Sequence, residues 1–175
     1  MSNLGDYGSA LGAIVALGAA GFTALQARVQ HRREDFELAR ALHTDLTTGL
    51  VADARALLGT VTFTDAASPG HDVGDVRRAY FTLLWSFERI EGGRSSMTDR
   101  HRRPKDKPDA VDFLDKLINW HVRFWNSDSG FPKIRDWLAD ELGDPVSDKD
   151  SVAAFERLAL HFPEPVAQPN PIAAV

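Results

Sequence analysis

The 175-residue sequence predicts an all-α protein, in which an N-terminal transmembrane helix continues into a long amphipathic helix and a compact bundle of about four further helices follows. Three observations lead to this prediction. Residues 7–27 carry no charge, apolar residues recur every three or four positions through most of the rest, and no useful stretch alternates apolar with polar residues. Thr60 to Thr64 is the one strand candidate, and a single strand has nothing to pair with.

The uncharged run from Tyr7 to Ala27 is 21 residues long, and about 20 largely apolar residues cross the ~30 Å core of a bilayer. Arg28, Arg32 and Arg33 follow it, whereas residues 1–6 contain no Lys or Arg. The positive-inside rule therefore predicts a short external N-terminus (1–6), a transmembrane helix (7–27) and a cytoplasmic helical domain (28–162) that ends in a Pro-rich tail (163–175). The predicted location is the inner, cytoplasmic membrane.

Other interpretations of this segment stay open. A cleaved signal peptide needs a positive first region, which residues 1–6 lack, although Gly18 and Ala20 resemble a cleavage site. A helix buried in a soluble core is compatible with the many Ala and Gly residues. An amphipathic helix lying on the membrane is disfavoured, because the segment has no polar face.

Small residues spaced by four predict that the same helix self-associates, because such a stripe lets two helix backbones approach closely. The stripe consists of Gly8, Gly12, Ala16 and Ala20. Twelve of the 21 residues are Gly, Ala or Ser, so a stripe of this kind also arises easily by chance. If the stripe is a contact surface, it predicts a homodimer in which two copies of this helix pack together.

Beyond the uncharged run, the spacing of Phe36, Leu42, Leu46 and later apolar residues predicts that one helix runs from about residue 7 to about residue 58. Gly49 is the expected weak point and Gly59 the expected end. A second helix is expected from Val76 to about Glu91, where Gly92 and Gly93 end it. It is apolar nearly all round, which is typical of a central, buried helix.

Proline and capping residues delimit three further helices. Pro108 fits the first turn of a third helix, and Asn126 to Gly130 breaks it. Pro132 begins a short fourth helix that Gly143 ends, and Ser147 with Asp150 resembles a capping box for a fifth. Four tryptophans lie on the apolar faces of these helices, where core packing is the expected role: Trp85, Trp120, Trp125 and Trp137.

Composition excludes several functions. With no Cys, the chain has no disulfide, no cysteine zinc site and no thiol nucleophile, and a net charge of −5 disfavours nucleic-acid binding. Asp109, Asp112 and Asp115 step by three and could hold Mg²⁺, but acids in the first turns of a helix also complement its dipole, which we favour. His121 is expected to be a hydrogen-bonded core histidine. We predict no catalytic, cofactor or metal residue.

The stretch from Arg94 to Lys107 is basic, with six cations against two acids. It is either a contact loop for an anionic lipid, an acidic partner or RNA, or a solvated linker between two helices. It contains no aromatic residue, so base stacking is not supported. The residues of the possible contact loop are Arg94, Arg100, Arg102, Arg103, Lys105 and Lys107.

The layout of residues 7–27, the Arg28–Arg33 flank and the segment Phe81-Thr82-Leu83-Leu84-Trp85-Ser86-Phe87-Glu88-Arg89 resembles small bacterial single-pass membrane proteins of uncharacterised function. The resemblance implies a membrane helix followed by a cytoplasmic helical domain, and it transfers no catalytic residue. We therefore expect a membrane-anchored, non-enzymatic module that binds another protein beside the lipid bilayer.

Two alternatives differ in class from this expectation. One is an enzyme whose active site is assembled from carboxylate and His side chains on different helices. The other is a soluble helical regulator in which residues 7–27 are buried.

Overall fold

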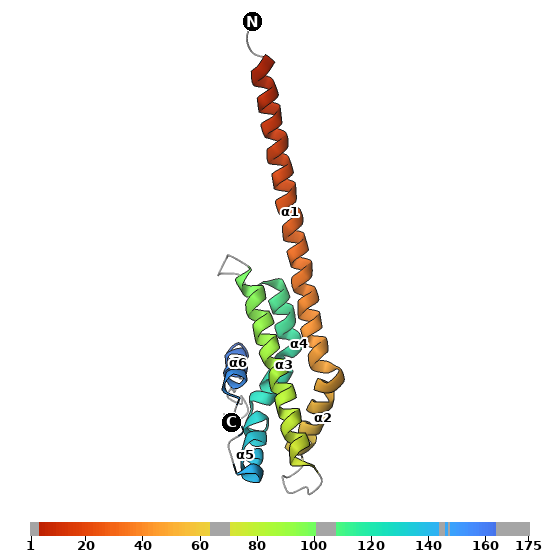
Figure 1. The fold of residues 1–175 in the computed structure, drawn as a ribbon, viewed down its shortest axis with the longest axis vertical. Coiled ribbons are helices and arrows are strands. Elements are labelled where there is room, and N and C mark those ends of the chain that lie inside the picture. Colours follow the sequence, from red (N-terminus) through yellow and green to blue (C-terminus); the bar gives the residue numbers. More distant parts are fainter. Residues whose placement is uncertain (1–3, 64–70, 101–107, 144–145, 147, 164–175) are drawn as a thin grey trace, which may run out of the picture. The chain divides into compact units, whose positions relative to one another are not determined.

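A computed structural model describes residues 4–63, 71–100, 108–143, 146 and 148–163, without the side chains of residues 4–20. Every element of this part is a helix, so the all-α class is confirmed (Figure 1). The chain divides into two compact units, Met1–Leu38 and Ala39–Val175, and each is described by itself. The helices are α1 Leu4–Thr47, α2 Gly49–Phe63, α3 Val73–Asp99, α4 Asp109–Asn126, α5 Phe131–Leu142 and α6 Lys149–Ala159.

The predicted transmembrane helix over residues 7–27 is contradicted. Within the part of the chain that the structure describes, no helix is long and apolar enough to cross a bilayer. The single-pass topology and the inner-membrane location that were predicted from this span are corrected with it.

The first unit is helical from Leu4 onward. Its predicted flank residues Arg28, Arg32 and Arg33 lie on α1 with exposed side chains. Gly8, Gly12, Ala16 and Ala20 also belong to α1, but their side chains lie outside the described residues, so the homodimer stays a prediction.

The long helix ends earlier than expected, at the glycine that was predicted to be its weak point. Gly49 has a φ of 58°, in the left-handed region that favours glycine, and it separates α1 from α2. The hydroxyls of Thr47 and Thr48 donate to the carbonyls of His43 and Thr44, both at 2.8 Å. Arg55 of α2 donates through Nη1 to the Leu46 carbonyl at 2.9 Å, which satisfies a backbone group at the end of α1.

Helix α2 continues through Gly59, the expected end, to Phe63. Residues 60–63 of the only strand candidate are helical because Leu58 and Val61 are buried against the neighbouring helices, and Thr64 lies outside the described residues. The hydroxyls of Thr60 and Thr62 donate to carbonyls of the preceding turn at 2.9 Å. Tertiary burial thus overrides the β-preference of these branched residues.

Helix α3 is the centre of the second unit and packs against α2, α4, α5 and α6. Its central position was predicted, but its length was not, since it runs through Gly92 and Gly93 to Asp99. A Cβ at residue 93 would lie 2.5 Å from Leu42 Cδ1, so Gly93 lets α3 and α1 approach closely. Gly93 therefore lies at a helix contact, and the glycine pair does not end α3.

The remaining helices begin and end close to the predicted residues. Pro108 precedes α4, Pro132 lies in the first turn of α5, and Gly143 ends α5 with a φ of 70°. The predicted capping box of the last helix is corrected, because the N-cap of α6 is Asp148, whose carboxylate accepts from the Ser151 amide. Ser147 lies outside the described residues.

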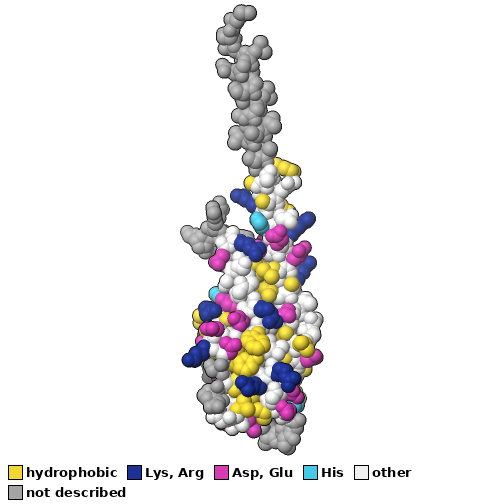
Figure 2. All heavy atoms as spheres, viewed as in Figure 1, with side chains coloured by type: hydrophobic (Ala, Val, Ile, Leu, Met, Phe, Trp, Pro, Cys, Tyr) yellow, Lys and Arg dark blue, Asp and Glu magenta, His cyan; other side chains and the backbone are white. Residues whose placement is uncertain are grey.

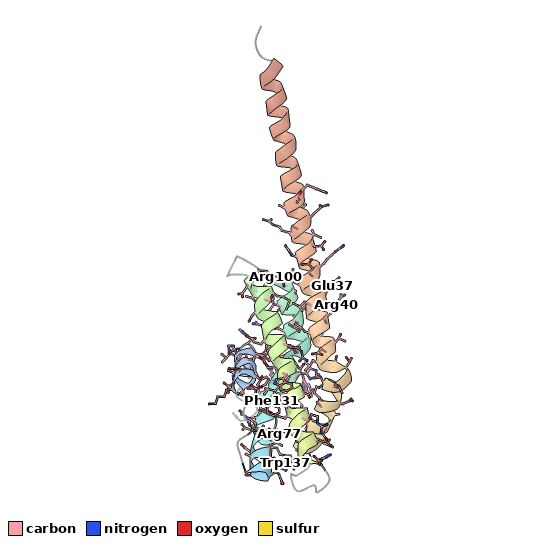
Figure 3. The ribbon with its side chains drawn as sticks, in the orientation of Figure 1. Glu37, Arg40, Arg77, Arg100, Phe131 and Trp137 are labelled. Atoms are coloured by element: carbon pink, nitrogen blue, oxygen red, sulfur yellow. The ribbon has the colours of Figure 1, made fainter. Side chains whose placement is uncertain are left out.

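The core is a cluster of aromatic rings between α3, α4, α5 and α6. Phe131, labelled in Figure 3, lies at the start of α5 and contacts four other rings at centroid distances of 4.9 to 5.9 Å. Those rings belong to Tyr80, Phe87, Trp125 and Phe155. Edge-to-face pairs of this kind stabilise a core beyond the area that they bury.

Candidate ligand-binding groove

A groove of about 750 Å³ lies along the N-terminal half of α3, at the point where α6 begins. Side chains of α3 spaced by three or four form one wall, and the first residues of α6 form the other. This volume is in the range of ligand pockets in proteins, about 300–1,000 Å³. The groove is lined by Gly74, Arg77, Arg78, Phe81, Thr82, Trp85, Asp148 and Lys149.

Two stacked aromatic rings form the apolar floor of the groove. Phe81 and Trp85 lie one helical turn apart, with ring centroids at 5.8 Å and an interplanar angle of 28°. The guanidinium of Arg77, one turn earlier, lies 6.0 Å from the Phe81 ring centroid. Trp85 is 48% exposed, which is unusual for so large an apolar side chain on a central helix.

Asp148 holds the indole of Trp85 in place and joins α3 to α6. Trp85 Nε1 donates to Asp148 Oδ2 at 2.9 Å, while Asp148 Oδ1 accepts from the amide of Ser151 at 3.3 Å. These bonds to the Trp85 indole and to Ser151 hold the pKa of Asp148 below its ordinary value. The Ser151 hydroxyl lies 2.6 Å from Glu88 Oε2 and 3.0 Å from Asp148 Oδ2, which ties the same turn of α6 to α3.

The rim of the groove is positive. Three cations and one carboxylate line it, and that carboxylate, Asp148, is engaged by Trp85 and Ser151. Arg78 forms an ion pair with Asp75 at 2.9 Å, but both side chains are more than half exposed, so the pair is weak. Figure 2 shows a cluster of hydrophobic side chains bordered by Lys and Arg on one face of the protein. The groove therefore suits a ligand that is both anionic and apolar.

The prediction that all four tryptophans pack in the core is only partly confirmed. Trp125 is 2% exposed, but Trp85 lines the groove, and Trp120 is 61% exposed in a stack on Phe124 at 5.4 Å. The sequence could have indicated the different position of Trp85, because Arg77, Phe81 and Trp85 are spaced by four residues and form one stripe of α3. Periodicity alone did not show that this stripe lacks a covering helix.

Of the six residues of the predicted basic contact loop, the structure describes two, Arg94 and Arg100. Arg94 lies inside α3 and not in a loop, because the helix continues past the glycine pair. Its Nε donates to Asp115 Oδ1 at 3.0 Å and its Nη2 to Asp115 Oδ2 at 3.2 Å, in a pair whose side chains are 11% and 9% exposed. Arg100 is the C-cap residue of α3. Arg102, Arg103, Lys105 and Lys107 lie outside the described residues.

The acids that were weighed as a magnesium site have other partners. Asp115 binds Arg94 and Asp112 binds Lys116 at 2.7 Å. Among the described residues, no group of three or more His, Asp or Glu side chains is placed to hold a metal ion.

His121 differs from the expected hydrogen-bonded core histidine, because its Nδ1 is buried with no hydrogen-bond partner. Burial, then the nearby Arg55 and His43, lower its pKa to about 4. Neither His121 nor His43 lines the groove.

Comparisons of the chain with protein-family models, with curated proteins and with solved structures gave no match. The resemblance to bacterial single-pass proteins therefore stays a prediction, and the function is inferred from the groove alone.

Proposed function

We propose that this protein is a helical binding module whose groove between α3 and α6 takes an acidic segment of a partner protein that carries an aromatic or large apolar side chain. The observation that supports this proposal is the stack of the half-buried Phe81 and the exposed Trp85 within a rim of Arg77, Arg78 and Lys149. An aromatic anchor surrounded by complementary charge is the arrangement in which a few residues supply most of the binding energy.

Each part of the groove has a separate role in this proposal. The ligand's apolar side chain packs on the open face of the Trp85 indole, which Asp148 fixes by its hydrogen bond. Because the indole is already held, little side-chain entropy is lost when the ligand binds. Arg77 and Lys149 attract the acidic residues of the ligand, and this attraction weakens with salt because both side chains are exposed.

The test uses a fluorescein-labelled peptide in which one Trp and one Leu are flanked by Asp and Glu, with anisotropy as the measurement. We expect saturable binding to the full chain. Trp85→Leu is expected to weaken it about tenfold, or ~1.4 kcal/mol, and Arg77→Gln by a smaller, salt-dependent factor.

The matched controls are Trp120→Leu, an exposed tryptophan on α4, and Arg157→Gln, an exposed arginine on α6. Neither lines the groove, so binding should not change. Equal losses in the control and groove variants would contradict the proposal. So would equal binding of a peptide whose acids are replaced by Lys.

A further inference from the structure

A second cavity is lined by residues of both α5 and α6. An open cleft of about 390 Å³ runs between the two helices, and an inner chamber of about 60 Å³ lies behind it. Arg135, Val152 and Glu156 line both, so the cleft and the chamber are adjacent. The inner chamber does not share a lining residue with the groove described above.

Two residues that line the inner chamber each carry a buried polar group without a hydrogen-bond partner. The groups are the hydroxyl of Tyr80 and the indole Nε1 of Trp125, in side chains that are 0% and 2% exposed. A buried polar group with no partner costs about 1–3 kcal/mol. Two of them on one small cavity therefore indicate that the cavity receives a group that bonds to both.

The donors of the lining select an acceptor, and the one carboxylate among the residues that line the chamber, Glu156, is on an exposed residue. The indole N–H only donates, the tyrosine hydroxyl donates, and Arg135 at the entrance carries five N–H donors and a positive charge. The charge of Arg135 acts on Tyr80, where it opposes the burial that raises the pKa of the hydroxyl to about 12. Tyr80 therefore keeps its proton and donates it at neutral pH.

Size and charge together restrict the ligand further. The chamber has the volume of about two liquid water molecules, which is room for a head group and not for a whole metabolite. A guanidinium with two neutral donors matches a carboxylate, which accepts several hydrogen bonds at once. The rest of the ligand would extend into the wider cleft past Val152.

We propose that this protein binds a small monocarboxylic acid, with its carboxylate in the inner chamber on Tyr80, Trp125 and Arg135 and its short chain in the α5/α6 cleft. The inner chamber shares no lining residue with the groove of the proposed function, and the cleft shares only Lys149 with it, so either proposal can fail without the other.

The experiment follows the four indole N–H signals of the full chain by ¹H–¹⁵N NMR while sodium acetate or sodium butyrate is added. Trp→Phe variants assign the signals. We expect the Trp125 signal to move saturably and the signals of Trp120 and Trp137 to stay in place, because neither lines the cleft or the chamber. Butyrate is expected to bind more tightly than acetate, because its chain reaches the cleft.

Acetamide and n-butylamine are the matched probes for charge, and neither is expected to move the Trp125 signal at the same concentrations. Tyr80→Phe removes one oxygen from the chamber, and Arg135→Gln removes the charge at its entrance. Each is expected to weaken butyrate binding about tenfold. Arg157→Gln, an exposed cation on α6 that lines neither cavity, should leave binding unchanged.

Three outcomes would overturn the proposal. The first is a Trp125 signal that neither carboxylate moves, which would mean that only water fills the chamber. The second is an equal shift with acetamide, and the third is unchanged butyrate affinity in Arg135→Gln. If Tyr80→Phe unfolds the chain, Arg135→Gln at the partly exposed entrance still decides the result.

Discussion

Two aspartates three residues apart on α4 show how strongly burial changes the role of one residue type. Asp115 forms a bidentate pair with Arg94 in which both side chains are about nine-tenths buried, whereas the Asp112–Lys116 pair is largely exposed. A buried ion pair is costly to break, because the charge that remains is buried without an ion-pair partner and is poorly hydrated.

Asp115→Asn is therefore expected to lower the free energy of unfolding by about 3 kcal/mol, measured by urea denaturation. Asp112→Asn is the matched control on the same helix, and its effect should be much smaller because solvent screens its partner. Equal effects of the two substitutions would show that the buried Arg94–Asp115 pair contributes no more to the free energy of unfolding than the exposed Asp112–Lys116 pair.

His121 makes stability depend on pH. Its pKa in the folded chain is about 4, below the ordinary 6.5, because burial disfavours the charged imidazole. Protonation therefore favours the unfolded chain. The stability that the neutral form contributes is fully present above pH 6.5 and is lost as the pH falls from 6.5 towards 4.

We expect His121→Gln to reduce the pH dependence of the free energy of unfolding in this window. His161→Gln, a change at an exposed histidine, should leave the dependence as it is in the original chain. Urea denaturation at a series of pH values measures both. An unchanged slope in His121→Gln would contradict the assignment of the titration to this residue.

At the scale of elements, the adjacent glycines of α3 predict opposite responses to one substitution. A Cβ on Gly92 meets nothing within 4 Å, whereas a Cβ on Gly93 would lie 2.5 Å from Leu42 Cδ1. Alanine is favoured over glycine in a helix by about 1 kcal/mol.

Gly92→Ala is thus expected to raise the free energy of unfolding by about 1 kcal/mol. Gly93→Ala should gain less or lose stability, because Leu42 must move away from the new methyl group. Thermal and urea denaturation of the two variants provide the comparison. A larger gain from Gly93→Ala would mean that α1 and α3 do not approach closely there.

At the scale of the whole molecule, α3 connects the second unit because it packs against four other helices. Phe87 on α3 is fully buried, and its ring contacts those of Phe131 on α5 and Phe155 on α6. A substitution there opens a cavity that three helices share.

Phe87→Ala is expected to lower the free energy of unfolding by about 3–5 kcal/mol, with tryptophan fluorescence as the measurement, because all four tryptophans lie between residues 85 and 137. Leu160→Ala, at a side chain that is 80% exposed, should change it by less than about 0.5 kcal/mol. A small loss in Phe87→Ala would indicate that the ring cluster is not the core of this unit.

The amino-acid sequence by itself determined the features that depend on neighbouring residues. Helical periodicity determined the all-α class of the protein. The backbone preferences of Gly and Pro determined the break near Gly49 and the limits of α4 and α5 at Pro108, Pro132 and Gly143. The uncharged run of residues 7–27 is also a local feature, but its interpretation as a transmembrane helix was wrong, because lack of charge over a run does not alone make a helix span a membrane.

Only the tertiary structure decided which apolar and charged side chains are covered. Helix α6 begins beside Trp85, so it leaves the preceding turns of α3 open, and an apolar stripe that looked like core becomes the floor of a groove. Arg94 pairs with Asp115, and Gly93 meets Leu42, across distances of 21 and 51 residues in the sequence. Periodicity reports which face of a helix is apolar, but burial depends on where the partner helix starts and stops, and that is a property of the packed chain.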